Sequence, residues 1–431
     1  MSTAAMALDE PKSWSAGKRM GFRFVFSYLV IYSFPFPIGV IPWTSWPADK
    51  YEKLWEAMII WTGKHVLHLA KPITFFLSGS GDKTSDYVQL LLFVTFSAVA
   101  TIVWTLLDRK RKDYRRLHEW LRIYVRYVLG YTLLGYGLDK VIPNQMIPPG
   151  PEKLIEPFGD FSPMGLLWYF MGFSAPYMIF AGGVETLGGL LLFLRRTTPL
   201  GALVACGAMF NVAMLNYSYD TPVKLYSTNL FLFAFFLLAP DLRRAANVLA
   251  LNRPAEAAKL DFPLELRARW MRISRQAAKI AFVGFTLFTL IKGGIAEHRQ
   301  LTARSPLYGA YNVEEFSDNG QTLPPLETDA KRWGKVAFHF PTNMVVRMMD
   351  GSAKGFRTDF DTAKGIVTLS TFQDAAKKYA VNYSRPDAEH VVLQGQLQGE
   401  TVVIKLKRID ESKFLLISRG YHWINEYPLN R

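Results

Sequence analysis

Two patterns of hydrophobic and polar residues divide the chain near residue 300. Before that point, apolar residues form runs of about 20, which is the length of helix that crosses a bilayer. After it, β-branched and aromatic residues alternate with polar ones, as in strands that bury one face. The sequence therefore predicts a polytopic α-helical membrane protein with a β-rich C-terminal domain.

The apolar runs predict about seven transmembrane helices. Pro35 and Pro37 are expected to kink or break the first of them near its outer end. Between the first and second runs, residues 50–77 mix Trp, Ile and Leu with Lys and Glu, which predicts a helix lying in the membrane interface. The predicted spans are 21–42, 87–107, 120–141, 176–194, 198–217, 224–240 and 277–294.

The placement of Lys and Arg predicts the orientation. A net charge of +14 could indicate nucleic-acid binding, but the basic residues cluster between apolar runs, as at 109–116 and 243–279. The alternate loops hold far fewer, so the positive-inside rule places the N-terminus in the cytoplasm. An odd number of spans in the plasma (inner) membrane then makes the C-terminal domain periplasmic or extracellular. We expect membrane lipid and an envelope protein as partners, and no nucleic acid.

Few residues are suited to metal or redox chemistry. Cys206 is the single cysteine, which excludes an intramolecular disulfide, a CxxC relay and a cysteine-based metal site within this chain. His65 and His68 are spaced to share one face of the predicted interfacial helix, but two histidines without further ligands do not make a metal site. We therefore expect no metal and no encoded cofactor, and a quinone is a candidate ligand.

Glu185 is a single carboxylate in the middle of the fourth predicted span. A charged group at membrane depth is costly, so it usually has a partner or marks an ion path or a ligand site. It lies about nine residues, roughly 13 Å of helix, from either end of the span. Arg126 of the third span is expected at a similar depth. Two interpretations stay open: a proton or ligand site with Glu185 and Arg126 as catalytic residues, and a structural ion pair.

Polar residues collect at the predicted outer ends of the third, fifth and sixth spans. In one helical bundle they would converge and could recognise a lipid headgroup or a quinone carbonyl. The alternative is a set of solvated loop residues with Lys140 extending to the interface. The candidate ligand-binding residues are Lys140, Asp139, Asn211, Asn216, Asp220, Lys224 and Asn229.

The C-terminal part reads as seven to nine short strands separated by turn residues such as Asp350-Gly351 and Gln398-Gly399. This spacing predicts an antiparallel meander, closed as a barrel or folded as a sandwich. The aromatic run 419–427 is expected to plug one end of a barrel or to face the membrane. The clearest strand patterns are 335–340, 343–349, 365–370, 378–383, 390–397, 401–407 and 413–418.

A family resemblance is carried by short motifs between about residues 120 and 245. They are Gly137-Leu-Asp-Lys140, Gly182-Gly-Val-Glu185-Thr-Leu-Gly188-Gly189, Arg195-Arg196-Thr197 and Ala239-Pro240-Asp241. This stretch resembles the DoxX-like family of four-helix membrane proteins. The resemblance implies a DoxX-like four-helix bundle as the core of the membrane part. Some members are membrane subunits linked to quinone redox chemistry, such as thiosulfate:quinone oxidoreductase, so it also implies a quinone-linked role as one alternative.

Four parts are expected: N-terminal helices over 1–119, the DoxX-like bundle over 120–245, a basic linker with the last span over 246–299, and the β domain over 300–431.

The first functional hypothesis is an envelope protein that binds a lipid, an apolar ligand or a partner protein through its external β domain. The alternative is a quinone-linked redox subunit with an intramembrane proton or quinone site; whether the protein is an enzyme stays open. The two differ in whether the β interior is an open cavity or is filled by side chains such as Trp333, Phe338 and Trp423.

Overall fold

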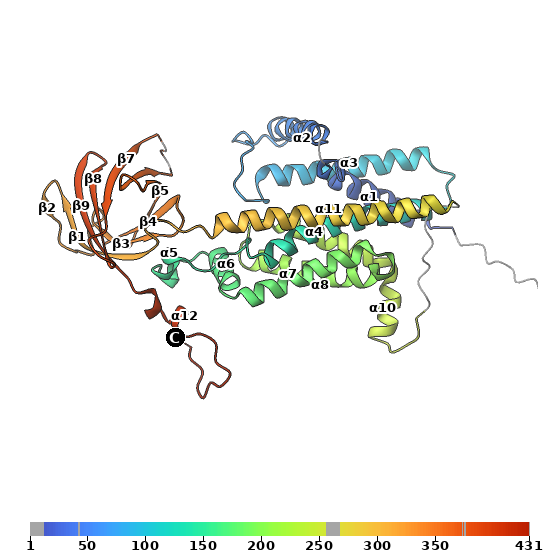
Figure 1. Cartoon of the computed structure of the whole chain (residues 1–431). Coiled ribbons are helices and arrows are strands. Elements are labelled where there is room, and N and C mark those ends of the chain that lie inside the picture. Colours follow the sequence, from blue (N-terminus) through green and yellow to red (C-terminus); the bar gives the residue numbers. More distant parts are fainter. Residues whose placement is uncertain (1–12, 42–43, 256–267, 373, 375, 431) are drawn as a thin grey trace, which may run out of the picture. The chain divides into compact units, whose positions relative to one another are not determined.

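The computed structural model describes residues 13–41, 44–255, 268–372, 374 and 376–430. It contains a helical part and a β-barrel (Figure 1). The chain divides into two compact units: residues 1–141 with 178–292, and residues 142–177 with 293–431. We describe each unit by itself.

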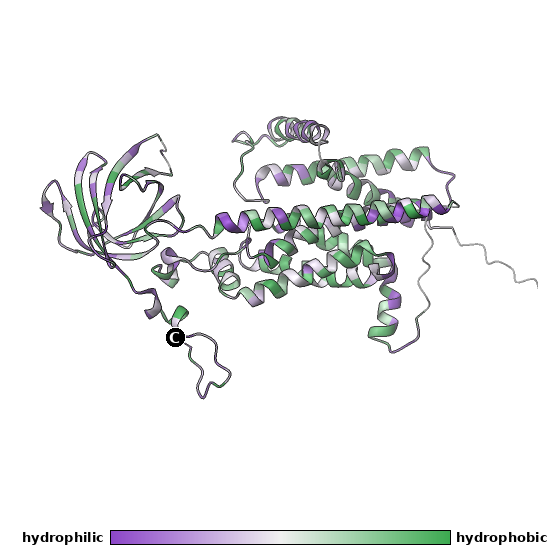
Figure 2. Cartoon of the chain, in the orientation of Figure 1, coloured by the Kyte–Doolittle hydropathy of each residue, from purple (hydrophilic) through white to green (hydrophobic). Residues whose placement is uncertain are grey.

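Six helical segments in the described residues are long and apolar enough to cross a membrane. Figure 2 shows many hydrophobic residues (green) along these helices, most continuously in the second segment. This finding is compatible with a membrane protein, as the sequence predicts. The segments are Ala16–Val40, Thr84–Leu107, Ala175–Phe193, Arg195–Ser218, Lys224–Leu249 and Arg269–Leu301.

The helices follow the predicted order. The first helix ends at Ser33, just before Pro35, so the predicted break at the prolines is confirmed. The helices that lie in the first unit or cross its boundaries are α1 Ala16–Ser33, α2 Ser45–His65, α3 Thr84–Leu107, α4 Arg115–Val141, α7 Ala175–Phe193, α8 Thr198–Ser218, α9 Lys224–Leu238, α10 Leu242–Leu249 and α11 Arg269–Leu301.

The predicted span at 120–141 forms helix α4, but it is not among the six membrane candidates. Its first turns carry several charged residues, which lowers its mean hydropathy. Its apolar face is nevertheless the core of this unit, since Val125, Leu129, Leu133 and Leu134 are fully buried. The count of seven spans therefore stays a prediction.

Helix α2 confirms a helix between the first two spans, but it covers Ser45–His65, so residues 66–77 of the predicted range lie outside it. It buries Trp55 and Ile59 against α3, while Trp46 and Trp61 are mostly exposed. That amphipathic pattern suits an interfacial helix. The helix ends at His65, so the prediction that His65 and His68 share one helical face is wrong. His68 instead has a positive φ of 48° in the following loop.

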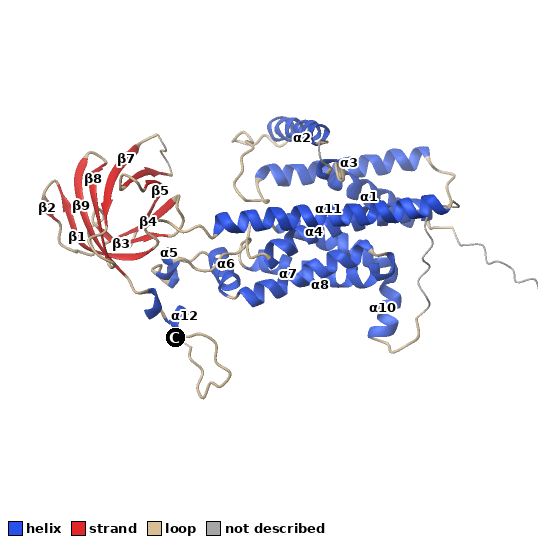
Figure 3. Ribbon diagram, in the orientation of Figure 1, coloured by secondary structure: helices blue, strands red, loops and turns tan. Residues whose placement is uncertain are grey.

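The second unit is an antiparallel β-barrel (Figure 3). Eight strands follow one another as neighbours, and β1 closes the ring by pairing with β9. The short β2 only extends β1 as a hairpin. Of the two predicted architectures, the barrel is confirmed. The strands are β1 Gly309–Asp318, β2 Gln321–Thr322, β3 Trp333–Phe338, β4 Asn343–Met348, β5 Ala353–Asp361, β6 Ile366–Thr371, β7 Lys378–Ser384, β8 His390–Leu397 and β9 Glu400–Arg408.

Side chains fill the barrel interior. An eight-stranded barrel is just wide enough either to be filled by its own inward-pointing side chains or to hold one small ligand. Trp333 and Phe338 are at most 4% exposed and belong to one continuous apolar cluster with residues of every strand of the ring. Trp423 is 89% exposed, so it does not contribute to this interior.

The C-terminal segment differs from its prediction. Residues 413–418 form a helical turn and the short helix α12, Leu415–Ser418, and not a strand. Tyr421, Trp423 and Tyr427 are each more than three-quarters exposed, so the aromatic run does not plug the barrel. That it faces the membrane stays a prediction.

The Pro-rich segment between α4 and α7 belongs to the barrel unit. It contains α5, Pro151–Leu154, and α6, Pro163–Phe173. Glu152 Oε1 lies 3.1 Å from Nδ1 of His339, and Arg347 Nη1 donates to Asp160 Oδ2 at 2.8 Å. These polar contacts attach the segment to Arg347 of β4 and to His339, which directly follows β3.

Candidate functional site

Glu185 of α7 pairs with Lys140 of α4. Lys140 Nζ donates to Glu185 Oε2 at 2.8 Å, and both side chains are more than nine-tenths buried. Burying two charges costs several kcal/mol of desolvation each, roughly, and a close hydrogen-bonded pair offsets that cost. The ion pair therefore ties α4 to α7 in the interior of the helical unit.

Glycines bring the two helices close enough for this pair. A Cβ atom added at Gly182 would lie 2.5 Å from the carbonyl oxygen of Gly137 and 2.6 Å from Lys140 Cβ. One added at Gly137 would lie 2.4 Å from Thr186 Oγ1. Small residues at such crossings allow backbones to touch. The glycine motifs that flank Glu185 in the sequence thus act in packing.

Arg126 does not join Glu185, so the predicted pairing is wrong. Its Nε donates to the backbone oxygen of Leu192 at 2.9 Å, and the side chain is buried. Leu192 lies about two helical turns beyond Glu185 on α7. The error arose because the depth of each residue in the membrane was estimated from its position in the apolar run. Lys140 lies at the end of α4, yet its side chain reaches Glu185 in the middle of α7.

The predicted outer polar residues fall into different environments. Asn216 and Asn229 are buried, Asp139 is half-buried, and Asn211 is exposed on the outside of the bundle. Lys224 Nζ donates to Asp220 Oδ1 at 2.8 Å. Lys140 belongs to the ion pair described above. Of the predicted residues, the structure therefore brings Lys224 and Asp220 together. Asp139, Asn211, Asn216 and Asn229 do not join them in one site.

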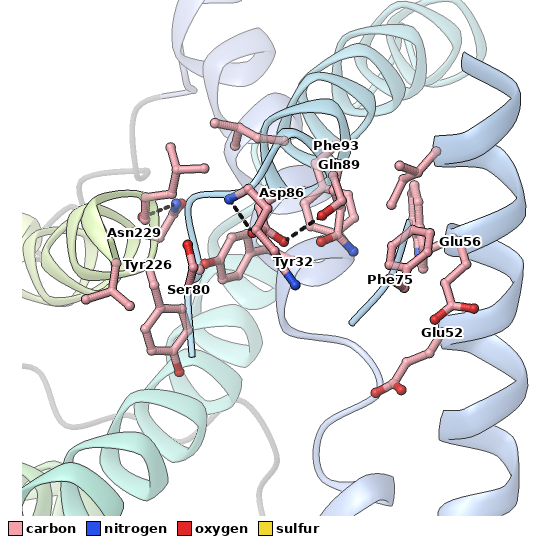
Figure 4. Close-up of a pocket in the computed structure, with 18 of the residues that line it drawn as sticks. Tyr32, Glu52, Glu56, Phe75, Ser80, Asp86, Gln89, Phe93, Tyr226 and Asn229 are labelled. Atoms are coloured by element: carbon pink, nitrogen blue, oxygen red, sulfur yellow. Dashed lines mark hydrogen bonds between the residues drawn. The ribbon is translucent and has the colours of Figure 1, made fainter. Parts of the chain in front are cut away.

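A cavity of about 700 Å³ lies among helices of this unit. Its wall comes from α1, α2, α3, α4, α9 and the loop before α3. Figure 4 shows Glu52 and Glu56 of α2 on one side, Tyr226 and Asn229 of α9 on the other, and Tyr32 and Asp86 between them. Asn229 is the one predicted ligand-binding residue in its lining.

The lining of the cavity is aromatic with a few polar groups. Tyr32, Tyr51, Trp55, Phe75, Phe93, Tyr136 and Tyr226 supply most of the ring surface. The amide of Gln89 lines the same space. Burial raises the pKa of Tyr51 above its ordinary value, and its hydroxyl donates to the backbone oxygen of Ile31 at 3.4 Å. Such a wall suits a ligand with an apolar body and a few polar atoms.

Two aspartates hold the loop that closes one side of the cavity. Asp82 accepts hydrogen bonds from the backbone N–H groups of Lys224 and Leu225, at the start of α9. Asp86 accepts from the N–H of Lys83 at 2.8 Å, which caps the start of α3. Carboxylates at helix N-termini satisfy N–H groups that have no partner within the helix. The loop is therefore anchored at both helices, and the cavity wall is preformed.

Tyr136 connects the cavity to the buried ion pair. Its ring lines the cavity, and Lys140 Nζ lies 5.8 Å from the ring centroid. This distance is within the range of a cation–π contact. A ligand in the cavity is thus separated from Lys140 and Glu185 by a single aromatic side chain.

Two acidic side chains line the cavity: Glu52, which is exposed to solvent, and Glu56, which is half-buried. Glu52 and Glu56 lie four residues apart on α2, and neither forms an ion pair with any residue that the structure describes. Like charges at this spacing repel each other by a few tenths of a kcal/mol, roughly. The described residues contain no group of three or more His, Cys, Asp and Glu arranged to hold a metal ion.

Sequence reasoning missed most of the cavity. Tyr32, Trp55 and Phe93 looked like ordinary core or interface residues, and their convergence depends on how α2 packs on α3. The spacing of Glu52 and Glu56 was a usable signal, because residues four apart lie on the same face of a helix.

Comparisons with known proteins add one relative. No protein-family model and no solved structure matches this chain. The uncharacterised protein YwoB of Bacillus subtilis (strain 168) is 33% identical over 119 residues, which are 28% of this chain and 75% of that protein. Its name states no ligand and no reaction. The resemblance to DoxX-like proteins stays a prediction.

Proposed function

This chain belongs to the same family as YwoB, and we propose that it is a cell-envelope membrane protein that binds a lipid or another amphipathic ligand. The ligand is held in the cavity between α1, α2, α3 and α9. The observation that carries this proposal is the cavity itself, with its aromatic wall and few polar groups.

The size and lining of the cavity support a small-molecule ligand. Sites for such ligands typically enclose about 300–1,000 Å³ and are mostly apolar, with a few placed polar groups. The present cavity of about 700 Å³ lies within that range. Phe93 and Trp55 can contact an apolar chain, while Gln89 and Tyr226 can bond polar atoms.

The filled interior of the barrel supports placing the ligand in the helical cavity. Trp333 and Phe338 occupy the barrel interior, so an apolar ligand has no room there without displacing the core. Binding of an envelope protein by the β domain would use the outer surface of the barrel. That remains a second role for the domain and is independent of the cavity.

The charge distribution supports an orientation with the N-terminus in the cytoplasm. In that orientation the cavity opens on the periplasmic or extracellular side, because the loop before α3 and the start of α9 both lie there. The ligand would then reach its site from the outer leaflet or from outside the membrane.

Mass spectrometry of small molecules that co-purify with the detergent-extracted protein tests the proposal. Gln89→Trp fills the cavity from α3, and Val94→Trp adds the same ring on an exposed face of that helix. We expect a bound amphipath in the wild type and in Val94→Trp, and its loss from Gln89→Trp. Equal ligand content in all three proteins would contradict the proposal.

A quinone-linked redox function is the second candidate, favoured by the position of Tyr136 between the cavity and the pair of Lys140 and Glu185. Glu185 would accept or release a proton while a quinone occupies the cavity. This function predicts that purified protein carries quinone and that Glu185→Gln, purified in its folded form, abolishes quinone-linked electron transfer. Unchanged transfer in that variant would exclude it.

A further inference from the structure

The uncompensated acids of the cavity indicate the chemistry of its ligand. Glu52, which is exposed, and Glu56, which is half-buried, line the cavity from one face of α2, and Figure 4 shows both on the side opposite Tyr226 and Asn229. Within the described part of the chain neither has an ion-pair partner. Their mutual repulsion is relieved by a positive charge placed between them, and this favours a cationic group on the ligand.

The other charged groups of the cavity are already engaged. Asp86 caps α3 through the N–H of Lys83. Lys83 Nζ donates to the backbone oxygen of Phe76 at 3.2 Å and lies 5.6 Å from the centroid of its ring. The lining therefore carries three carboxylates and one ammonium, and the two glutamates are the charges that remain open to a ligand.

The rings around the glutamates suit the same ligand. On α2, Tyr51 directly precedes Glu52 and Trp55 directly precedes Glu56. Phe75 and Tyr32 line the same cavity. The face of an aromatic ring attracts a cation, by about 0.5–2 kcal/mol depending on how far water is excluded. Carboxylates combined with aromatic rings around one cavity are groups that recognise an alkylammonium ion.

We propose that this cavity binds the ammonium headgroup of a membrane lipid, such as a phosphoethanolamine headgroup. The inference rests on the proposed function, and it adds the class of ligand. An anionic headgroup without an amine would meet the net negative charge of the lining. The apolar surface of Ile59, Leu90 and Phe93 favours a ligand with an apolar part over a soluble amine.

The test uses the full-length protein and two lipids with identical dioleoyl chains. Native mass spectrometry compares binding of dioleoyl phosphatidylethanolamine with dioleoyl phosphatidylglycerol. We expect the wild type to prefer the ethanolamine lipid about fivefold or more, which corresponds to one cation–π or ion-pair contact of about 1 kcal/mol. The double variant Glu52→Gln/Glu56→Gln should lose this preference, and Glu52→Lys should reverse it.

Asp49→Asn is the matched control, because it removes an acid from the same helix outside the cavity lining. It should keep the wild-type preference. Thermal unfolding measured on each variant separates loss of binding from loss of fold; removing the glutamates relieves repulsion, so the fold should persist.

The outcomes separate the two proposals. Binding of both lipids with equal affinity by the wild type, or an unchanged preference in the double variant, overturns the ammonium assignment and leaves the proposed function standing. Binding of neither lipid overturns the ammonium-lipid assignment, and the proposed function falls as well if no amphipath co-purifies with the wild type. Glycerophosphoethanolamine, which lacks acyl chains, should not compete at millimolar concentration; displacement of the lipid by it would overturn the assignment to a lipid.

Discussion

Lys140 Nζ lies 2.8 Å from Oε2 of Glu185, and this buried contact joins α4 to α7. Removing one partner leaves the other charge buried without compensation. We therefore expect Lys140→Met to lower the free energy of unfolding by about 3–5 kcal/mol. The double variant Lys140→Met/Glu185→Leu should lose clearly less free energy of unfolding, because neither buried charge remains. Denaturation of the protein in mixed micelles measures both.

Lys364→Met provides the control for that pair. Lys364 and Asp361 also lie within ion-pair distance, at 2.9 Å, but on the exposed surface of the barrel. Solvent screening makes such a pair contribute little to stability. A loss as large as that of Lys140→Met would show that burial is not what gives the Lys140 pair its importance.

The close approach of α4 and α7 makes Gly182 sensitive to one methyl group. A Cβ there would lie 2.5 Å from Gly137 oxygen, so Gly182→Ala must push the helices apart. We expect a loss of about 1–3 kcal/mol from overpacking. Gly183→Ala is the matched control, since nothing lies within 4 Å of its Cβ. It should be neutral or stabilising, because alanine favours helix. Thermal unfolding compares them, and equal losses would refute the packing argument.

The barrel core predicts a strong effect at Phe338. This side chain is fully buried, so Phe338→Ala leaves a cavity and should cost about 3–5 kcal/mol. Leu326→Ala removes a side chain that is 55% exposed and should have little effect. Hydrogen exchange of the strand amides in the full chain reports the local loss. Unchanged exchange in Phe338→Ala would mean that the interior is not tightly packed.

The buried hydroxyl of Tyr311 is expected to make the stability of the barrel fall at alkaline pH. Burial raises the pKa of its hydroxyl, which donates to the backbone oxygen of Leu307 at 3.0 Å. A pKa raised in the folded state gives stability that is complete below the unfolded value of about 10 and is lost as pH rises through the folded value. Tyr311→Phe should flatten the decline in barrel stability above pH about 10. An identical pH profile in the two proteins would contradict this role.

The sequence predicted the parts of this protein that depend on local periodicity. Apolar runs gave the order of the helices, and turn pairs such as Gln398-Gly399, both with positive φ, marked the hairpins of the barrel. Residues 413–418 were misread because a short apolar run cannot by itself separate a strand from a helical turn. The closure of β1 on β9 depends on a long-range pairing that no local pattern specifies.

The candidate site was predictable only in part. Glu185 stood out because a lone carboxylate in an apolar run needs a partner. Its partner was assigned to Arg126 rather than Lys140, since the relative depth of two helices is fixed by packing at Gly137 and Gly182. The cavity was missed for the same reason: its rings come from elements that are distant in sequence.

A structure of the protein in lipid nanodiscs tests the central claim most directly, which is that the ligand occupies the helical cavity and not the barrel. We predict elongated density between α2, α3 and α9, with its polar end beside Glu52 and Glu56, and only protein side chains inside the barrel. An empty cavity, or ligand density among Trp333 and Phe338 in the barrel interior, would contradict the account.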